Sequence, residues 1–197
     1  MLRRSRNNIA GIAFKLLPVA ARQRGLAGIG VELESPTGVD LLPIGGGATV
    51  VRCSEARDGK QVGELEVEVV KAALVIDRDG ILAEKVAHAC TTKPGRATQP
   101  VAVSLPGASG FRASVELVRP MGQPQPELPF VYVFAIAPHD LGVDGGVLVT
   151  VRSASREWPS ADKILRSLKV FGRKPVTAND DSGVLSLLPM IGDERDP

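Results

Sequence analysis

Aromatic side chains are scarce in this chain, which has 197 residues and an aromatic content of 4%. The hydrophobic core must therefore be built from Val, Leu, Ile and Ala, and few rings are available on which nucleic-acid bases could stack. The formal net charge is only +2, which is too small to indicate a polyanionic partner. We therefore expect no nucleic acid among the partners of this protein.

The chain contains only two cysteines, Cys53 and Cys90, which are too few for a disulfide-stabilised scaffold. Their positions in the sequence do not show whether they form a single disulfide. Free cysteines are most often buried, and free thiols are typical of reducing compartments. The sequence therefore favours a cytoplasmic protein.

Long apolar segments are also absent, so the sequence predicts no membrane-spanning helix. The N-terminus carries Arg3, Arg4 and Arg6 before an apolar run, which is the order found in a signal peptide. Lys15 interrupts this run and Pro18 breaks it. The interruption favours the cytoplasm over secretion.

Motifs of known catalytic sites are missing as well. A zinc site built from His88, Cys90 and Cys53 would lack a fourth ligand. No serine lies in a Gly-x-Ser-x-Gly elbow. The glycine-rich residues 43–48 lead into a β-branched run without the Lys-Ser/Thr pair of a P-loop. We therefore expect a protein that is not an enzyme and that binds no metal or cofactor.

The alternative function is a small ligand-binding or hydrolytic site near His139. The next residue is Asp140, and a histidine beside an acid is half of a nucleophile triad. Arg112 is the third candidate for this site. The alternative predicts a concave pocket near His139 in which polar groups converge.

The middle of the chain is dominated by strand patterns. In residues 63–76, Glu64, Glu66 and Glu68 alternate with apolar residues, which predicts a strand with one wet face and one dry face. Residues 81–90 favour a helix, with a hairpin strand as the competing interpretation. Further strands are predicted at residues 30–34, 48–53, 99–105, 110–118, 130–137 and 146–153.

An amphipathic helix is predicted at residues 159–169, directly after the last of these strands. Pro159 suits the first turn of a helix. The apolar face consists of Ala161, Ile164, Leu165 and Leu168. Successive strands with short connections favour an antiparallel sheet, and a helix that follows them covers it. The predicted fold class is therefore α+β, an antiparallel β-sheet covered by amphipathic helices, in a single domain with extended terminal segments.

The C-terminal half contains three strands, GFRASVELV, FVYVFAIAP and GGVLVTVRS, followed by a helix with an Ile-Leu-x-Ser-Leu stretch. In this chain the stretch is formed by Ile164, Leu165, Ser167 and Leu168. This order resembles the PsbP-like superfamily, including its LpqN-like and DcrB-like domains. The resemblance implies a central antiparallel sheet with helices on both sides. It also implies a non-catalytic protein that binds to larger complexes or supports their assembly.

Residues 1–25 form a basic N-terminal segment without any acidic residue. Apolar side chains recur there at helical spacing, which predicts an amphipathic helix with a kink or an end at Pro18. Those expected to contact a partner are Ile9, Ile12, Leu16 and Leu17. Such a helix covers the protein's own sheet, docks in a partner's groove or makes peripheral contact with an anionic membrane.

Residues 173–197 form an acidic C-terminal tail that contains proline and glycine. Within the tail, residues 184–191 form a short apolar patch flanked by acids. Exposed apolar patches are usually avoided, so we expect this patch to dock on the same domain, on a second copy or on another protein. The side chains predicted to make this contact are Val184, Leu187, Leu188 and Ile191.

The sequence therefore predicts three regions, which are the basic segment at 1–25, a core domain at 26–172 and the acidic tail at 173–197. The predicted function is a non-enzymatic protein-binding or assembly module that acts through its terminal segments. Its partner is expected to be another protein or a second copy of the same chain.

Overall fold

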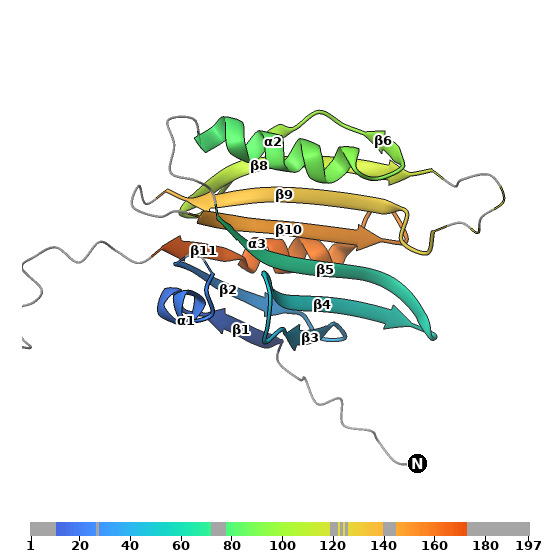
Figure 1. Cartoon of the computed structure of the whole chain (residues 1–197). Coiled ribbons are helices and arrows are strands. Elements are labelled where there is room, and N and C mark those ends of the chain that lie inside the picture. The colour runs from blue at the N-terminus through green and yellow to red at the C-terminus, as the bar shows by residue number, and fades with distance from the viewer. Residues whose placement is uncertain are drawn as a thin grey trace, which may run out of the picture.

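A computed structural model describes residues 11–26, 28–71, 78–118, 122, 124, 126–139 and 145–172 (Figure 1). Within these ranges the chain forms two antiparallel sheets and three helices. None of the helices in this part of the chain is long and apolar enough to cross a membrane.

The larger sheet has eight strands in the part of the chain that the structure describes. They run in the order β3-β4-β5-β10-β9-β8-β6, and β7 also pairs with β8. Their bounds are Asp40–Pro43 (β3), Thr49–Arg57 (β4), Lys60–Lys71 (β5), Gly95–Ala97 (β6), Val101–Leu105 (β7), Ala108–Leu117 (β8), Phe130–Pro138 (β9) and Gly145–Ser153 (β10). Every pairing is antiparallel, as the short connections between the predicted strands indicated.

The smaller sheet has the order β1-β2-β11 and joins the two ends of the described chain. Its strands are Ile12–Leu16 (β1), Ile29–Ser35 (β2) and Lys169–Gly172 (β11). The short helix α1 (Pro18–Gln23) connects β1 to β2, and β11 directly follows α3 (Pro159–Ser167). Both outer strands pair antiparallel with the largely buried β2.

Side chains of β9 alternate between two hydrophobic cores on opposite faces of the larger sheet. Val131, Val133 and Ala135 pack in one core with α2 (Arg78–Thr91), which covers β8 and β9. Ile136 faces the other core, where α3 and the smaller sheet cover β4, β5 and β10. Figure 1 shows α2 on one side of the larger sheet and the smaller sheet on the other. Each face of the larger sheet is therefore only partly covered.

The uncovered part of the α2 side carries charged side chains of neighbouring strands. Arg52 donates to Glu66 at 2.8 Å, and Arg152 lies 3.4 Å from Glu64. The intervening apolar side chains of β5 are buried on the opposite face. This arrangement confirms the predicted strand with one wet face and one dry face.

The helical interpretation of residues 81–90 is confirmed, because they lie within α2. Leu82, Val86 and Cys90 are buried at a spacing of four residues, as expected for one face of a helix. With α2 and α3 packed on opposite faces of an antiparallel sheet, the α+β fold class is also confirmed.

The helix predicted in the N-terminal segment is wrong for residues 12–16, which form β1. This segment pairs along its length with β2, and Phe14 and Leu16 face the core at the spacing of a strand. Pro18 begins α1 and does not kink a longer helix, because its missing N–H is tolerated in the first turn. Leu16 and Ala21 are buried, so the core includes residues that the sequence assigned to a separate segment.

The helix predicted at residues 159–169 is two residues shorter and ends at Ser167. Leu168 is extended, with φ −65° and ψ 121°, and from Lys169 the chain pairs with β2. Pairing with a distant strand therefore overrides the local helical pattern. The short strands β1, β3, β6 and β11 were not predicted. Of these, β11 depends on a partner far away in sequence, whereas β3 pairs with β4, the next strand along the chain.

Candidate binding groove

Three aromatic side chains lie on the part of the larger sheet that α3 leaves open. Phe130, Tyr132 and Phe134 are spaced by two along β9, so they share one face of the sheet. Each of them is only partly buried. With Trp158, they account for four of the seven aromatic residues in the chain. A chain that is poor in aromatic residues therefore concentrates them at one surface.

Three adjoining hollows run along this surface. The first, of about 220 Å³, lies between β9 and α3, and the others, of about 320 and 270 Å³, extend over β8. Tyr132 lines all three, so the hollows adjoin one another around this residue and are described together as one groove. We call this surface the aromatic groove and define it by Phe130, Tyr132, Phe134, Arg112 and Ser114 on the sheet and by Trp158, Asp162 and Leu165 on the opposite wall.

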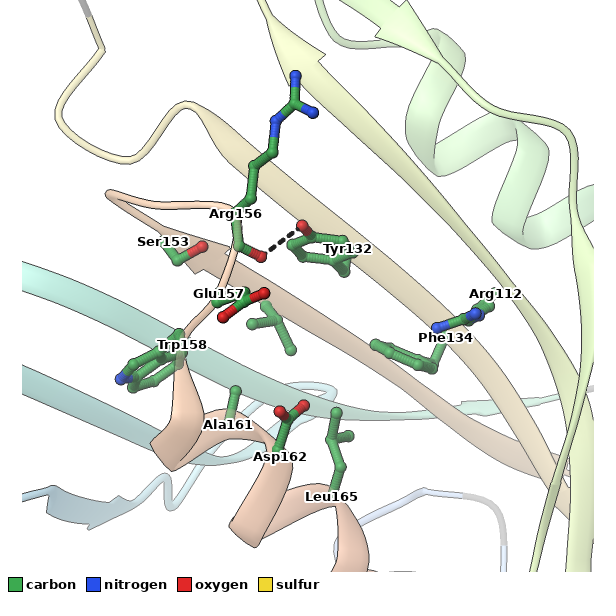
Figure 2. Close-up of a pocket in the computed structure, with 11 residues that line it drawn as sticks. Arg112, Tyr132, Phe134, Ser153, Arg156, Glu157, Trp158, Ala161, Asp162 and Leu165 are labelled. Carbon is green, nitrogen blue, oxygen red and sulfur yellow. Dashed lines mark hydrogen bonds between the residues drawn. The ribbon is translucent and has the colours of Figure 1, made fainter.

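Figure 2 shows how the sheet and α3 face each other across the first hollow. Asp162 and Leu165 point from α3 toward the rings of Tyr132 and Phe134. Arg112 lies beside Phe134, because the two residues are paired across β8 and β9. The groove therefore has an aromatic floor with a cation on the sheet side and a carboxylate on the helix side.

Arg156 covers one end of the groove. Its guanidinium lies 5.7 Å from the ring centroid of Phe130 and 3.0 Å from the carboxylate of Glu116. Its carbonyl oxygen accepts a hydrogen bond of 2.7 Å from the hydroxyl of Tyr132 (Figure 2). Both charged side chains are more than half exposed, so the ion pair contributes at most about 1 kcal/mol. The main effect of these contacts is to hold the turn between β10 and α3 over the sheet.

The N-terminal end of α3 is anchored by Glu55 of β4, which is 6% exposed. Trp158 Nε1 and Ser160 Oγ each donate to Glu55 Oε2 at 2.7 Å, and Arg57 donates to Oε1 at 2.8 Å. Burial alone would raise the pKa of Glu55, but these hydrogen bonds outweigh burial and hold the pKa below its usual value. The anchor fixes the helical wall of the groove in place.

The absence of a side chain at Gly63 allows Trp158 to lie flat on β5. A Cβ atom at this position would come within 2.4 Å of the indole ring. Gly63 also pairs with Ser153, which lines the first hollow. The glycine therefore sets how closely the helical wall approaches the sheet.

Two guanidinium groups beside the aromatic floor are unpaired within the described part of the chain. Arg112 and Arg96 are both exposed, and none of the described residues forms an ion pair or a hydrogen bond with either side chain. Guanidinium groups bind carboxylates through paired hydrogen bonds. Glu157 and Asp162 carry the opposite charge on the helical wall. The groove therefore suits a segment with apolar side chains in the middle and carboxylates toward β8.

The residues predicted to bind a partner through the N-terminal segment differ in how exposed they are in the structure. Ile12 and Leu17 are each 52% exposed and remain accessible. Leu16 is 7% exposed and packs in the core, so it is not accessible to a partner. The other predicted residues, Ile9, Val184, Leu187, Leu188 and Ile191, lie outside the described residues.

The residues suggested for the alternative site near His139 are only partly described, and the site stays a prediction. His139 lines a separate hollow of about 380 Å³ with Arg166 and Phe171, whereas Arg112 lines the aromatic groove. Asp140 lies outside the described residues. The backbone N–H of His139 donates to the carbonyl of Gly107, and this contact continues the pairing of β8 with β9.

The cysteines and His88 do not converge. Cys90 is buried and His88 is exposed on α2, while Cys53 lies in the other core. Both thiols are free, and burial raises the pKa of Cys53 to about 11 and also raises the pKa of Cys90. Among the described residues, no group of three or more His, Cys, Asp or Glu side chains is placed to hold a metal ion. Whether the protein resides in a reducing compartment stays a prediction.

The spacing of three aromatic residues in the sequence could have indicated the groove, although the low aromatic content does not. Rings at positions 130, 132 and 134 share one face of any strand. Aromatic side chains are usually buried, so three of them on one face predict either a core position or a binding surface. Only the position of α3 distinguishes these two outcomes.

No protein-family model and no curated protein matches this chain. Among solved structures, the solution structure of cyanobacterial PsbP (CyanoP) from Synechocystis sp. PCC 6803 is similar at a TM-score of 0.44 and 12% identity. The match covers 87% of this chain and 99% of that chain. A likeness this weak identifies neither a family nor a function, so the resemblance to the PsbP-like superfamily stays a prediction.

Proposed function

We propose that this protein is a non-catalytic binding module whose aromatic groove receives a segment of another protein. The observation that carries the proposal is the row of adjoining hollows along Phe130, Tyr132 and Phe134, beside Arg112, which has no partner among the described residues. The bound segment presents apolar side chains to the rings and a carboxylate to the guanidinium.

The residue types in the groove favour binding. Tyrosine, tryptophan and arginine are enriched among the side chains that contribute most to protein interfaces. The hydroxyl of Tyr132 is already bonded to Arg156, so the ring is held in place before any partner arrives. A side chain that is ordered in advance loses little conformational entropy on binding.

The side chains of Ser153, Glu55 and Ser167 are engaged in contacts that hold the fold together. Ser153 Oγ donates to the carbonyl of Ser155 at 2.6 Å, and Glu55 accepts from Trp158. Ser167 Oγ accepts from the backbone N–H of Glu34 at 2.9 Å and thereby links α3 to β2. These engagements support a binding role over a nucleophilic one.

The terminal segments remain part of the proposal. Ile12 and Leu17 offer exposed apolar side chains at the edge strand β1 and directly after it. These side chains would make the contact if residues 1–25 bind another protein, a second copy or a membrane surface.

Selection of random peptides displayed on phage tests the proposed function. The full-length protein is the bait, and each enriched peptide is then titrated against the Tyr132→Ala and Arg112→Ala variants. We expect enriched peptides to combine apolar side chains with acids. Loss of an aromatic contact that dominates the interface costs about 2 kcal/mol, which corresponds to roughly thirtyfold weaker binding.

A matched control is Lys85→Ala, which removes a cation from α2 on the opposite side of the larger sheet. Peptides that bind the groove must keep their affinity for this variant. The proposal is overturned when no peptide is enriched, or when enriched peptides bind wild type and the Tyr132→Ala variant equally well. Circular dichroism spectra of all variants confirm that the fold is retained.

A further inference from the structure

The chain itself contains a segment that matches the aromatic groove. We propose that the C-terminal apolar patch, residues 184–191, docks in the groove of the same molecule and competes with the partner segment. This inference rests on the proposed function, since it takes the groove to be a binding surface. It makes the tail an internal competitor of the partner.

The composition of the tail fits that of the groove. Residues 184–191 read VLSLLPMI, with Asp180 and Asp181 before them and Asp193 and Glu194 after them. The apolar side chains match the aromatic floor, where burial stabilises by about 25 cal/mol per Å² of apolar surface. The acids on both sides match Arg112 and Arg96 beside that floor, which have no partner among the described residues.

The tail is long enough to reach the groove within one molecule. The last described residue, Gly172, follows Phe171, which lines the hollow that also contains Pro138 at the end of β9. From Pro138 to Tyr132 the strand covers six residues, or about 20 Å at roughly 3.4 Å per residue. The residues numbered 173–183 span at most about 40 Å when extended, so a second copy is not required.

The order of charges along the groove also matches the tail. Starting from Pro138, the groove meets Arg112 opposite Phe134 and only later Arg96 opposite Glu116. A tail that runs in this direction brings its first pair of acids near Arg112 and its later acids near Arg96. The carboxylates of Glu157 and Asp162 repel acids on the helical wall, so the acids of the tail face β8.

The rate at which a thiol introduced into the groove reacts with a labelling reagent shows whether the tail covers the groove. Ser114→Cys introduces a thiol on β8, where Ser114 lines two of the hollows. Both native thiols are buried, so the new thiol is the one expected to react with a water-soluble disulfide reagent. In the full-length chain, Leu187→Asp with Leu188→Asp removes the apolar contact, and we expect the new thiol to react about tenfold faster.

Two controls separate docking from other effects. Thr177→Asp with Ser182→Asp adds the same charge outside the apolar patch and must not accelerate labelling. Glu84→Cys places a thiol on exposed α2, and its labelling rate must not respond to the changes in the tail. Docking within one molecule also requires labelling rates that do not depend on protein concentration.

The inference is overturned when the patch substitutions leave the labelling rate at Ser114→Cys unchanged. It is also overturned when protection increases with protein concentration, because a second copy is then the occupant. The peptide selection distinguishes this failure from failure of the proposed function. If selected peptides bind through Tyr132 although the tail does not protect the thiol, the proposed function stands. In that case only the inference that the tail competes for the groove is wrong.

Discussion

Replacing Glu55 by alanine removes the acceptor that holds α3 to the larger sheet. Trp158 Nε1 and Ser160 Oγ both donate to one carboxylate oxygen at 2.7 Å, and Trp158 is only 4% exposed. An indole N–H left without a buried partner costs about 1–3 kcal/mol. Arg57 is 66% exposed and can turn to water. We therefore expect Glu55→Ala to lower the free energy of unfolding by about 2–4 kcal/mol.

Glu55→Gln keeps an acceptor for Trp158 and loses the charge. Hydrogen bonds to a charged acceptor are about twice as strong as neutral ones. This variant should therefore be destabilised by about 1–2 kcal/mol, less than Glu55→Ala. The order of the two variants separates loss of the acceptor from loss of its charge.

The destabilisation depends on pH with a definite sign. Burial would raise the pKa of Glu55, but hydrogen bonds from Trp158, Ser160 and Arg57 lower it below its usual value. Its charged form therefore stabilises the fold above the unfolded pKa of about 4.3, and this contribution is lost as the pH falls through the folded pKa. The difference in stability between wild type and Glu55→Gln must shrink as the pH falls below this value.

Urea unfolding at neutral and at acidic pH measures these differences. Circular dichroism follows the whole fold, and the fluorescence of Trp158, the chain's single tryptophan, follows the anchor. The reasoning is refuted if Glu55→Ala unfolds within about 0.5 kcal/mol of wild type. It is also refuted if the difference between wild type and Glu55→Gln does not change with pH.

Gly63→Ala should lower the free energy of unfolding by about 1–3 kcal/mol in urea titrations, because its Cβ would lie 2.4 Å from the Trp158 ring. Leu82→Ala should cost about 2–5 kcal/mol in the same assay, because the side chain is fully buried between α2 and the sheet. Cys53 and Cys90 should resist thiol reagents in the native protein and react fully in urea, because burial raises the pKa of both.

The controls for these predictions use the same chain. At Gly45 an added Cβ meets no atom within 4 Å, so Gly45→Ala should change stability by less than about 0.5 kcal/mol. Equal effects at Gly45 and Gly63 would contradict the packing argument. Rapid labelling of either native thiol without denaturant would show that its core opens locally.

Local patterns in the sequence predicted much of the fold. Alternation in β5 and the four-residue spacing of Leu82, Val86 and Cys90 in α2 each correspond to one dry face. These patterns are reliable because the spacing of the side chains on one face depends only on the geometry of the strand or helix itself. The N-terminal helix was wrong because five residues of β1 are too few to distinguish a spacing of two from helical spacing when a distant strand decides the outcome.

The candidate site was harder to predict because it depends on what covers the sheet. The spacing of Phe130, Tyr132 and Phe134 shows that they share a face, but not whether that face is buried. Their exposure follows from the position of α3, which depends on Glu55 and Gly63, about a hundred residues earlier in the chain. A pattern within one strand or helix cannot reveal contacts between residues so far apart in the sequence.

The sequence by itself determined most of the antiparallel strands, the two longer helices and the scarcity of aromatic residues. Each of these follows from residue types and their spacing along a short stretch of chain. The tertiary structure alone decided that β11 joins β2 and that α3 covers only part of the sheet. Contacts between residues far apart in sequence fix both features, and they turn three ordinary strand residues into the floor of a groove.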